Sequence, residues 1–237
     1  MFPLYDDNPR QGTPVVTLAI IGICISVFLW QLSVAAESGR AIALSFGLIP
    51  ARFFEDFCPP ANLITIPTWL PVFTSLFFHL GWFHLGSNML FLWIFGDNVE
   101  DAMGHRRFIV FYFACGAAAA FAQVAANPSA IEPMIGASGA IAGVLGAYIL
   151  LYPRAKVRTL VFLGVFVTVV RIPAAIVLGI WFAIQFWSAL GPGSEGVAVW
   201  AHVGGFVAGL ILVPFLKRSE VSLLQPPRSR AVTREAS

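Results

Sequence analysis

Charged residues are scarce in this sequence. Only 11% of its 237 residues are charged and 58% are hydrophobic, whereas ordinary soluble domains are about 25% charged and just under half apolar. The apolar surface includes 22 Phe and 7 Trp and exceeds what one core of this size can bury. A water-soluble globule is therefore not expected. We expect one compact helical domain whose outer surface is solvated by membrane lipid.

Cysteine and net charge are also low. The three cysteines form no CxxC pair and no metal-ligand spacing, so neither a disulfide framework nor a metal site is predicted. The formal net charge is only +2, and the basic residues lie in predicted loops and tails, so nucleic acid is not expected as a partner. The sequence contains no HExxH motif and no pair of intramembrane aspartates, which argues against metalloprotease and aspartyl-protease chemistry.

Six apolar segments are candidates for membrane-spanning helices, because about 20 apolar residues cross the roughly 30 Å hydrocarbon layer. Four are clear and two are shorter: 15–35, 80–99, 107–126 and 172–190, then 137–153 and 200–216. The run 159–170 is apolar and β-branched but short, so we interpret it as an extended or interfacial connector. A seventh span there is the alternative. The predicted fold is an all-α, six-helix membrane domain over 15–216.

The basic residues predict the orientation of these helices, since short cytoplasmic loops accumulate Lys and Arg. Six spans place both termini on one side, and every Lys and Arg except Arg40 and Arg52 falls on that side. We therefore predict a cytoplasmic N-terminal tail over 1–14, and a polar, disordered cytoplasmic tail over 217–237. A long external loop, about 36–79, joins the first two helices. The N-terminus lacks signal-peptide features, which favours a bacterial plasma membrane.

Two polar side chains within the spans, Ser138 and His202, are candidates for catalysis, because polar groups in a bilayer are costly and rare. Ser138 begins a helix in the segment GASGAIAGVLGA, where small-residue helix packing is the simpler interpretation. His202 lies in WAHVGGFVAGLILVPF and needs a hydrogen-bond partner. Taken alone, it fits a buried structural histidine as well as a general base.

Glycines favour a close approach of the two helices. Gly205 and Gly209 follow His202 at i+3 and i+7 and clear one helix face, while Gly139 and Gly143 follow Ser138. Two small-residue faces can pack closely in a membrane. The approach would bring the Ser138 hydroxyl within hydrogen-bonding reach of the His202 imidazole.

A depth calculation is consistent with this pairing. Ser138 lies 16 residues before Arg154, and His202 lies 15 residues before Lys217. At 1.5 Å of rise per residue, both side chains lie about 22 to 24 Å above the basic cytoplasmic border. The predicted site is therefore several ångströms below the outer membrane surface, where water reaches it from outside and a substrate helix from the side.

His84 and Asn88 lie at i and i+4 on the second predicted span, so they share one helix face. Both side chains carry donors that could stabilise an oxyanion together with the backbone N–H of Ser138. Interhelical hydrogen bonding alone is the other interpretation of this pair. His79, at the end of the long loop, is expected to be a structural hydrogen-bonding residue.

These motifs, in this order, resemble those of the rhomboid intramembrane serine proteases over roughly 70–215. The resemblance rests on Gly136-Ala137-Ser138-Gly139, on Ala201-His202-Val203-Gly204-Gly205 and on the HxxxN pair of His84 and Asn88. It implies a six-helix rhomboid-like bundle with Ser138 as nucleophile, His202 as base, and no metal, nucleotide or other cofactor. It also implies that the partners are transmembrane protein substrates within the lipid, cut in or near their membrane segments.

Two departures from the family pattern stand out. Trp69-Leu70-Pro71 replaces the family's Trp-Arg loop pair, and Ala142 stands where many members have an aromatic ring beside the catalytic histidine. Either another ring holds His202, or the pair of Ser138 and His202 is looser than in those members. No carboxylate is placed to orient His202, since Asp97, Glu100 and Asp101 are expected to pair with Arg106 or Arg107; a Ser-His dyad therefore fits better than a triad. A non-catalytic rhomboid-like binding protein and a small-solute transporter remain the alternatives.

Overall fold

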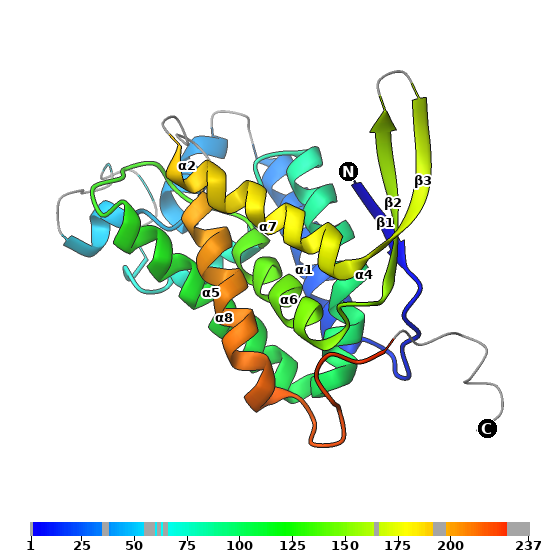
Figure 1. The fold of residues 1–237 in the computed structure, drawn as a ribbon. Helices are drawn as coiled ribbons and strands as arrows, with labels where there is room; N and C mark the ends of the chain where they lie inside the picture. The colour runs from blue at the N-terminus through cyan, green and yellow to red at the C-terminus, as the bar shows by residue number, and fades with distance from the viewer. Residues whose placement is uncertain are drawn as a thin grey trace.

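The structure is a computed structural model that describes residues 2–34, 38–54, 60, 63, 66–163, 166–191 and 198–226. Each of the six apolar segments forms a helix. These helices are α1 (Val15–Ser33), α4 (Trp82–Met103), α5 (His105–Ala126), α6 (Ser138–Leu151), α7 (Ala174–Leu190) and α8 (Val199–Leu216). In Figure 1, α6 lies inside the bundle, and it contacts α4, α5, α7 and α8. The core around α6 is aromatic, with Phe95, Phe108, Phe111, Tyr112 and Tyr148 fully buried.

The outer surface of the bundle is apolar, as expected of a membrane domain. Three helices, α1, α5 and α8, are long and apolar enough to cross a membrane, whereas α6 and α7 are apolar but shorter. Helix α4 has 22 residues, but polar side chains such as Asn88 and Asp97 reduce its apolar character. Large apolar side chains such as Trp187 and Phe215 remain exposed, which favours contact with lipid over water. The count of six spans stays a prediction.

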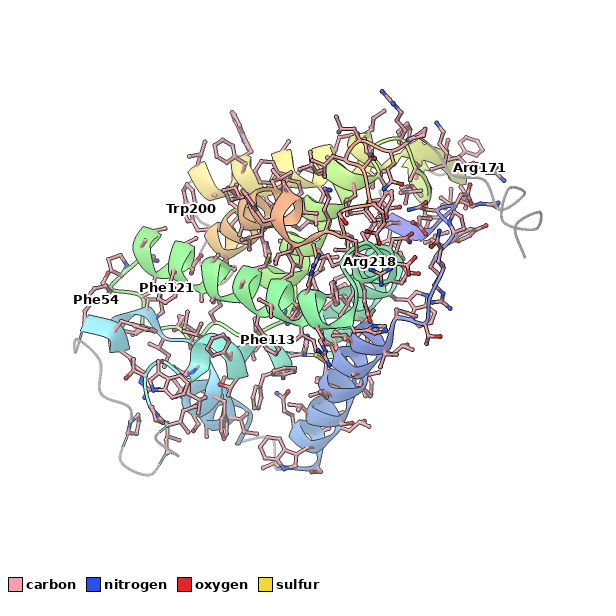
Figure 2. The ribbon with its side chains drawn as sticks, turned by 90° about the horizontal axis from the view of Figure 1, so that it is seen from below. Phe54, Phe113, Phe121, Arg171, Trp200 and Arg218 are labelled. Atoms are coloured by element: carbon pink, nitrogen blue, oxygen red, sulfur yellow. The ribbon has the colours of Figure 1, made fainter. Side chains whose placement is uncertain are left out.

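The connection between α1 and α4 contains short helices rather than one open loop. They are α2 (Ser38–Phe46), the 3₁₀ helix η1 (Pro50–Phe54), α3 (Pro71–Thr74) and the 3₁₀ helix η2 (Ser75–Phe77). The rings of Phe46 and Phe78 stack at 5.1 Å, and Leu48 forms a backbone bridge with Met134. This connection is thereby fastened to the segment that leads into α6. In Figure 2, Phe54 and Arg171 mark opposite edges of the molecule.

The all-α prediction is wrong in one respect, because the structure contains a three-stranded antiparallel sheet. Its strands, in the order β1-β2-β3, are β1 (Phe2–Asp6), β2 (Lys156–Leu163) and β3 (Phe166–Pro173). The segment expected to be an extended connector or a seventh span thus supplies two strands, which fits its β-branched composition. The N-terminal segment, expected to be a simple polar tail, adds β1 beside β2 (Figure 1).

Acidic side chains fasten the end of the bundle where β1 and residues 217–226 lie, which we call the terminal end. The buried Glu100 carboxylate accepts hydrogen bonds from the backbone N–H groups of Val16 and Thr17 and from the Thr17 hydroxyl, at 2.7–2.9 Å. It also contacts His105 at 2.6 Å. Glu100 therefore satisfies free amides at the start of α1, where a negative charge is favourable.

The expected pairing of these acids with Arg106 or Arg107 is therefore replaced by other contacts. Asp97 lies 3.7 Å from Arg10, and Asp101 accepts hydrogen bonds from the backbone N–H groups of Gln11 and Gly12. The physical reason is the chain segment before α1. It lies over the end of α4, where the Arg10 side chain reaches Asp97 and the Gln11 and Gly12 backbone donors reach Asp101.

The C-terminal segment also differs from the expected disordered tail over the residues described. The Arg218 N–H donates to the carbonyl of Ala102 at 2.8 Å, and the Leu224 and Gln225 N–H groups donate to the carbonyls of Leu150 and Leu151. Side chains of Val221 and Leu223 pack on the core. The first hydrogen bond caps a free carbonyl at the end of α4, and the other two cap free carbonyls at the end of α6. Residues 227–237 lie outside the described part of the chain.

Candidate active site

Ser138 stands in the first turn of α6, directly after a tight backbone turn. Gly136 has φ +127°, a conformation that favours glycine, and a Cβ there would lie 2.7 Å from imidazole atoms of His84. The Gly136 N–H donates to the carbonyl of Ser75 at 2.9 Å. Glycine at this position therefore lets the chain pass close to His84 just before α6 begins.

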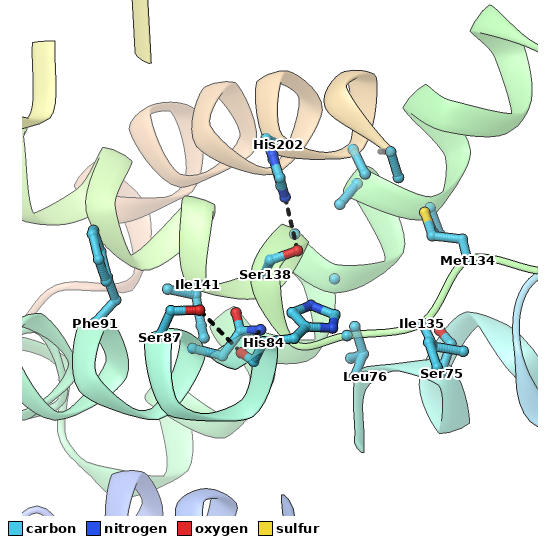
Figure 3. Close-up of a pocket in the computed structure, with 18 of the residues that line it drawn as sticks. Ser75, Leu76, His84, Ser87, Phe91, Met134, Ile135, Ser138, Ile141 and His202 are labelled. Carbon is cyan, nitrogen blue, oxygen red and sulfur yellow. Dashed lines mark hydrogen bonds between the residues drawn. The ribbon is translucent and has the colours of Figure 1, made fainter. Parts of the chain in front are cut away.

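The hydroxyl of Ser138 contacts the imidazole of His202. The distance from Ser138 Oγ to His202 Nε2 is 2.8 Å, and Figure 3 shows this bond crossing from α6 to α8. It lies within the range expected for a nucleophile and its base. The two side chains predicted to meet are brought together from positions 64 residues apart.

The closeness of α6 and α8 depends on glycine on both helices. A Cβ on Gly205 would overlap the carbonyl oxygen of Gly139, and a Cβ on Gly209 would overlap that of Gly143. On the other side of α6, a Cβ on Gly139 would lie 2.6 Å from the Ala119 Cβ of α5. The absence of side chains at these positions therefore sets the spacing across which Ser138 reaches His202.

Helix α7 supplies two contacts to His202 that the sequence analysis missed. The Nδ1 atom of His202 lies 2.8 Å from the Oε1 atom of Gln185, and the Trp181 ring lies 5.9 Å from the imidazole, centroid to centroid. Trp181 is the ring expected to compensate for Ala142. The sequence did contain a signal for Gln185, because it is a polar side chain inside a predicted span and lies one turn after Trp181 on the same helix face.

Polar side chains on α4 face the other side of Ser138. In Figure 3, Ser138 lies between His202 and the pair formed by His84 and Ser87. The His84 Nδ1 atom accepts a hydrogen bond from the Leu80 N–H at 3.3 Å, so its Nε2 atom is the ring nitrogen that can donate. The Asn88 side-chain amide donates to the His84 carbonyl at 2.9 Å, and the Ser87 hydroxyl donates to the same carbonyl at 3.1 Å.

One cavity joins all of these groups. Its volume is about 390 Å³, and its lining includes Ser138, His202, Gln185, His84 and Asn88. Apolar side chains form much of the remaining wall, among them Leu76, Phe91, Ile135, Ile141 and Trp181. An apolar cavity with a few convergent polar groups is the usual form of a binding site for an organic substrate.

His79 is a neighbour of the site rather than part of the lining given above. Its ring packs edge-on against the His84 ring at 5.1 Å, and its backbone is held by the Gln31 side chain through two hydrogen bonds of 3.1 and 3.2 Å. The His79 ring nitrogens are buried and have no hydrogen-bond partner among the described residues. The contact with His84 fits a supporting role.

Metal-ligating side chains do not gather in the described ranges: no three His, Cys, Asp or Glu residues lie close enough there to hold a metal ion. Cys24 and Cys115 are buried free thiols, and Cys58 falls outside the described residues.

Comparison with known proteins identifies the family. The Rhomboid domain matches residues 67–219, a range that contains Ser138, His202, His84 and Asn88. The chain belongs to the rhomboid family. Members of this family are membrane-embedded, in agreement with the apolar exterior of α1, α5 and α8.

Three rhomboid relatives show how far the similarity extends. Rhomboid protein 1, mitochondrial, of Saccharomyces cerevisiae is 31% identical over 222 residues, 89% of this chain and 54% of the relative. Rhomboid protease GluP of Bacillus subtilis is 30% identical over 200 residues, 84% of this chain and 34% of the relative. Rhomboid-like protein 11, chloroplastic, of Arabidopsis thaliana is 30% identical over 156 residues, 64% of this chain and 54% of the relative. The chain thus spans about half the length of two relatives and about a third of the other.

Proposed function

We propose that this rhomboid protein is an intramembrane serine endopeptidase that cleaves transmembrane segments of other membrane proteins. The observation that carries the proposal is the 2.8 Å contact between the Ser138 hydroxyl and His202 Nε2 beside a mostly apolar cavity. A hydroxyl and an imidazole at this distance form a nucleophile and base. The name of one relative supports it, since GluP of Bacillus subtilis is a rhomboid protease.

The reaction begins with acyl transfer to Ser138. Its oxygen attacks the carbonyl carbon of the scissile peptide bond while His202 Nε2 takes the hydroxyl proton. The protonated His202 then gives this proton to the leaving nitrogen, and the C–N bond breaks. Water next attacks the acyl-enzyme, again losing a proton to His202, and the serine hydroxyl is restored when that proton returns to it.

The negative charge on the carbonyl oxygen needs fixed donors during both attacks. Donors available in the cavity include the His84 Nε2–H, the Asn88 amide and the Ser138 backbone N–H at the start of α6. Each such donor typically contributes about 3–4 kcal/mol of transition-state stabilisation. The Asn88 amide now donates to the His84 carbonyl at 2.9 Å, so its role requires a second hydrogen from the same nitrogen or a change of rotamer.

The substrate class follows from the surroundings of the site. Exposed apolar side chains on α7, including Ile184 and Trp187, put the nearby surface in contact with lipid, from which a transmembrane segment can approach. We propose a six-span protein with both termini cytoplasmic, because Lys and Arg gather in the tails and in the loops on the side of the termini. A bacterial-type plasma membrane is its proposed location. Labelling of single introduced cysteines from either side of sealed vesicles tests this orientation.

The decisive experiment uses purified protein in detergent or liposomes with a fluorophosphonate probe and a reporter transmembrane substrate. Wild-type protein is expected to be labelled at Ser138 and to cleave the reporter. Ser138→Ala is expected to lose both, whereas Ser26→Ala, on the exposed face of α1, keeps both. Labelling that persists in Ser138→Ala, or vesicle transport of a solute by a wild type that the probe never modifies, would overturn the proposal.

A further inference from the structure

Gln185 forms a hydrogen bond with the ring nitrogen of His202 that faces away from Ser138. Resting on the function proposed above, we infer that Gln185 is the positioning residue for His202, a third member of the site whose amide oxygen fixes the tautomer and the direction of the imidazole. It touches His202 and not Ser138 in the contacts described, so it acts through the base.

The two ring nitrogens of His202 have different tasks. Its Nε2 atom lies 2.8 Å from Ser138 Oγ, and its Nδ1 atom lies 2.8 Å from Gln185 Oε1. For Nε2 to accept the serine proton, the ring hydrogen of the neutral imidazole must sit on Nδ1. The carbonyl oxygen of Gln185 accepts a hydrogen bond from Nδ1–H and so favours the tautomer in which Nε2 is free.

Aromatic packing holds Gln185 where it can make this bond. Trp181, one turn earlier on α7, lies beside the rings of both His202 and Phe206, at 5.9 and 6.3 Å. Phe182 stacks on Phe206 at 4.4 Å. These contacts dock one face of α7 against α8, and the part-buried Gln185 side chain projects from the docked face toward the imidazole.

A neutral amide suits this position better than the carboxylate of a serine-protease triad. Placing an anion in a mostly apolar site within a membrane is costly unless it is paired, and His202 is charged only during the reaction. An amide accepts the Nδ1–H bond at no such cost. It does not, however, stabilise the imidazolium as a carboxylate does.

The difference between an amide and a carboxylate provides a test of whether Gln185 positions His202 or only holds α7 against α8. Gln185→Ala removes the acceptor and is expected to lower kcat and the rate of fluorophosphonate labelling by about 10- to 100-fold, with little change in KM. Gln185→Glu keeps an acceptor but adds a negative charge, which favours imidazolium. Its rate is expected to recover, with the acidic limb of the pH–rate profile displaced to higher pH.

The controls make each outcome decisive. Ile176→Ala, an exposed position nearer the start of the same helix, is expected to leave the rate and the pH profile unchanged. If Gln185→Ala does not fold, Gln185→Glu still tests the inference through its pH profile. Wild-type rates and an unshifted profile in the Gln185 variants, or a loss of thermal stability with a rate lowered equally at every pH, would overturn the positioning role. A wild type that is never labelled at Ser138 would instead overturn the proposed function, whatever Gln185 does.

Discussion

The two ends of the helical bundle satisfy their polar groups in different ways. At the terminal end, one carboxylate, Glu100, accepts three hydrogen bonds from the start of α1 and also contacts His105. At the site end, Ser138 and His202 lie beside an open cavity, and Ser138 has His202 as its side-chain partner. From this difference we infer that the terminal end contributes more to stability, whereas the polar groups at the site end line a cavity that a bound molecule could fill.

His202→Ala is expected to have the largest effect on the reaction rate relative to its effect on thermal stability. Removing the base should lower the labelling and cleavage rates by at least about 1,000-fold, because the Ser138 hydroxyl loses its proton acceptor. The melting temperature should change by only a few degrees, since His202 is part-buried and makes two side-chain bonds. Parallel measurement of labelling rate and thermal unfolding checks this prediction. A collapse of the fold in this variant would mean that the two ends are not separable.

Gly205→Ala should instead damage chemistry and stability together. The added Cβ would overlap the Gly139 carbonyl oxygen, so α6 and α8 must move apart, at a typical cost of about 1–3 kcal/mol for an overpacked position. The same movement lengthens the Ser138–His202 contact and should lower the labelling rate more than tenfold. Gly179→Ala on α7 is the matched control, because a Cβ there meets no atom within 4 Å. Equal behaviour of the two variants would rule out glycine packing as the spacer.

Glu100→Gln should have the opposite pattern to His202→Ala. The buried carboxylate caps α1, and hydrogen bonds to a charged group contribute about 1.5–3 kcal/mol each, so the amide should lower the melting temperature clearly. The rate of Ser138 labelling at low temperature should stay near the wild-type rate. Asp101→Asn is the control, because its bonds to the Gln11 and Gly12 amides are exposed and should be worth less. A slower labelling rate in Glu100→Gln would show that the terminal end controls the site.

The apolar helices could be predicted from the sequence because each contains a long run of apolar side chains. The pairing of Ser138 with His202 was open to prediction for a related reason: depth from the basic border and glycine spacing are both readable along single helices. Gln185 was missed although the same rule about polar side chains in spans applies to it. Its partner lies on another helix, and the rotation of α7 about its own axis is set by the packing of Trp181 and Phe182, which no local pattern reports.

The terminal end was harder to predict because its contacts join segments that are far apart in the chain. Pairing of β1 with β2 depends on a register between residues 2–6 and 157–160, and the carboxylates of α4 meet the backbone just before or at the start of α1. Short polar segments give a weak sequence signal, and the structure around them decides whether they are tails or strands.

The smallest effect we predict is a dependence of stability on pH at the terminal end, through Asp6. Burial, reinforced by Asp97 and Asp7, raises the pKa of the Asp6 carboxyl to about 7, although the hydrogen bond from the Tyr148 hydroxyl opposes this shift in part. The folded protein therefore keeps a proton that the unfolded chain, with a pKa near its ordinary 3.8, releases.

Because the folded state binds more protons between about pH 4 and pH 7, the contribution of Asp6 to stability is largest at about pH 4 and falls as the pH rises through 7. Asp6→Asn removes the ionisation and keeps an acceptor for Tyr148, so it should raise the melting temperature by a few degrees at pH 8 and leave it almost unchanged at pH 4. Asp7→Asn, which removes contacts of 3.5 and 3.7 Å with Arg158 and Arg171, should not raise the melting temperature at pH 8.

Thermal unfolding at both pH values checks the sign of this effect. A lower melting temperature of Asp6→Asn at pH 8 would show that the ionised carboxylate stabilises the junction of β1 with α4 and α6. The Ser138 labelling rate, measured below the unfolding range, should be the same in all three proteins, because the junction fastens the far ends of those helices and leaves the spacing of Ser138 and His202 to the glycines.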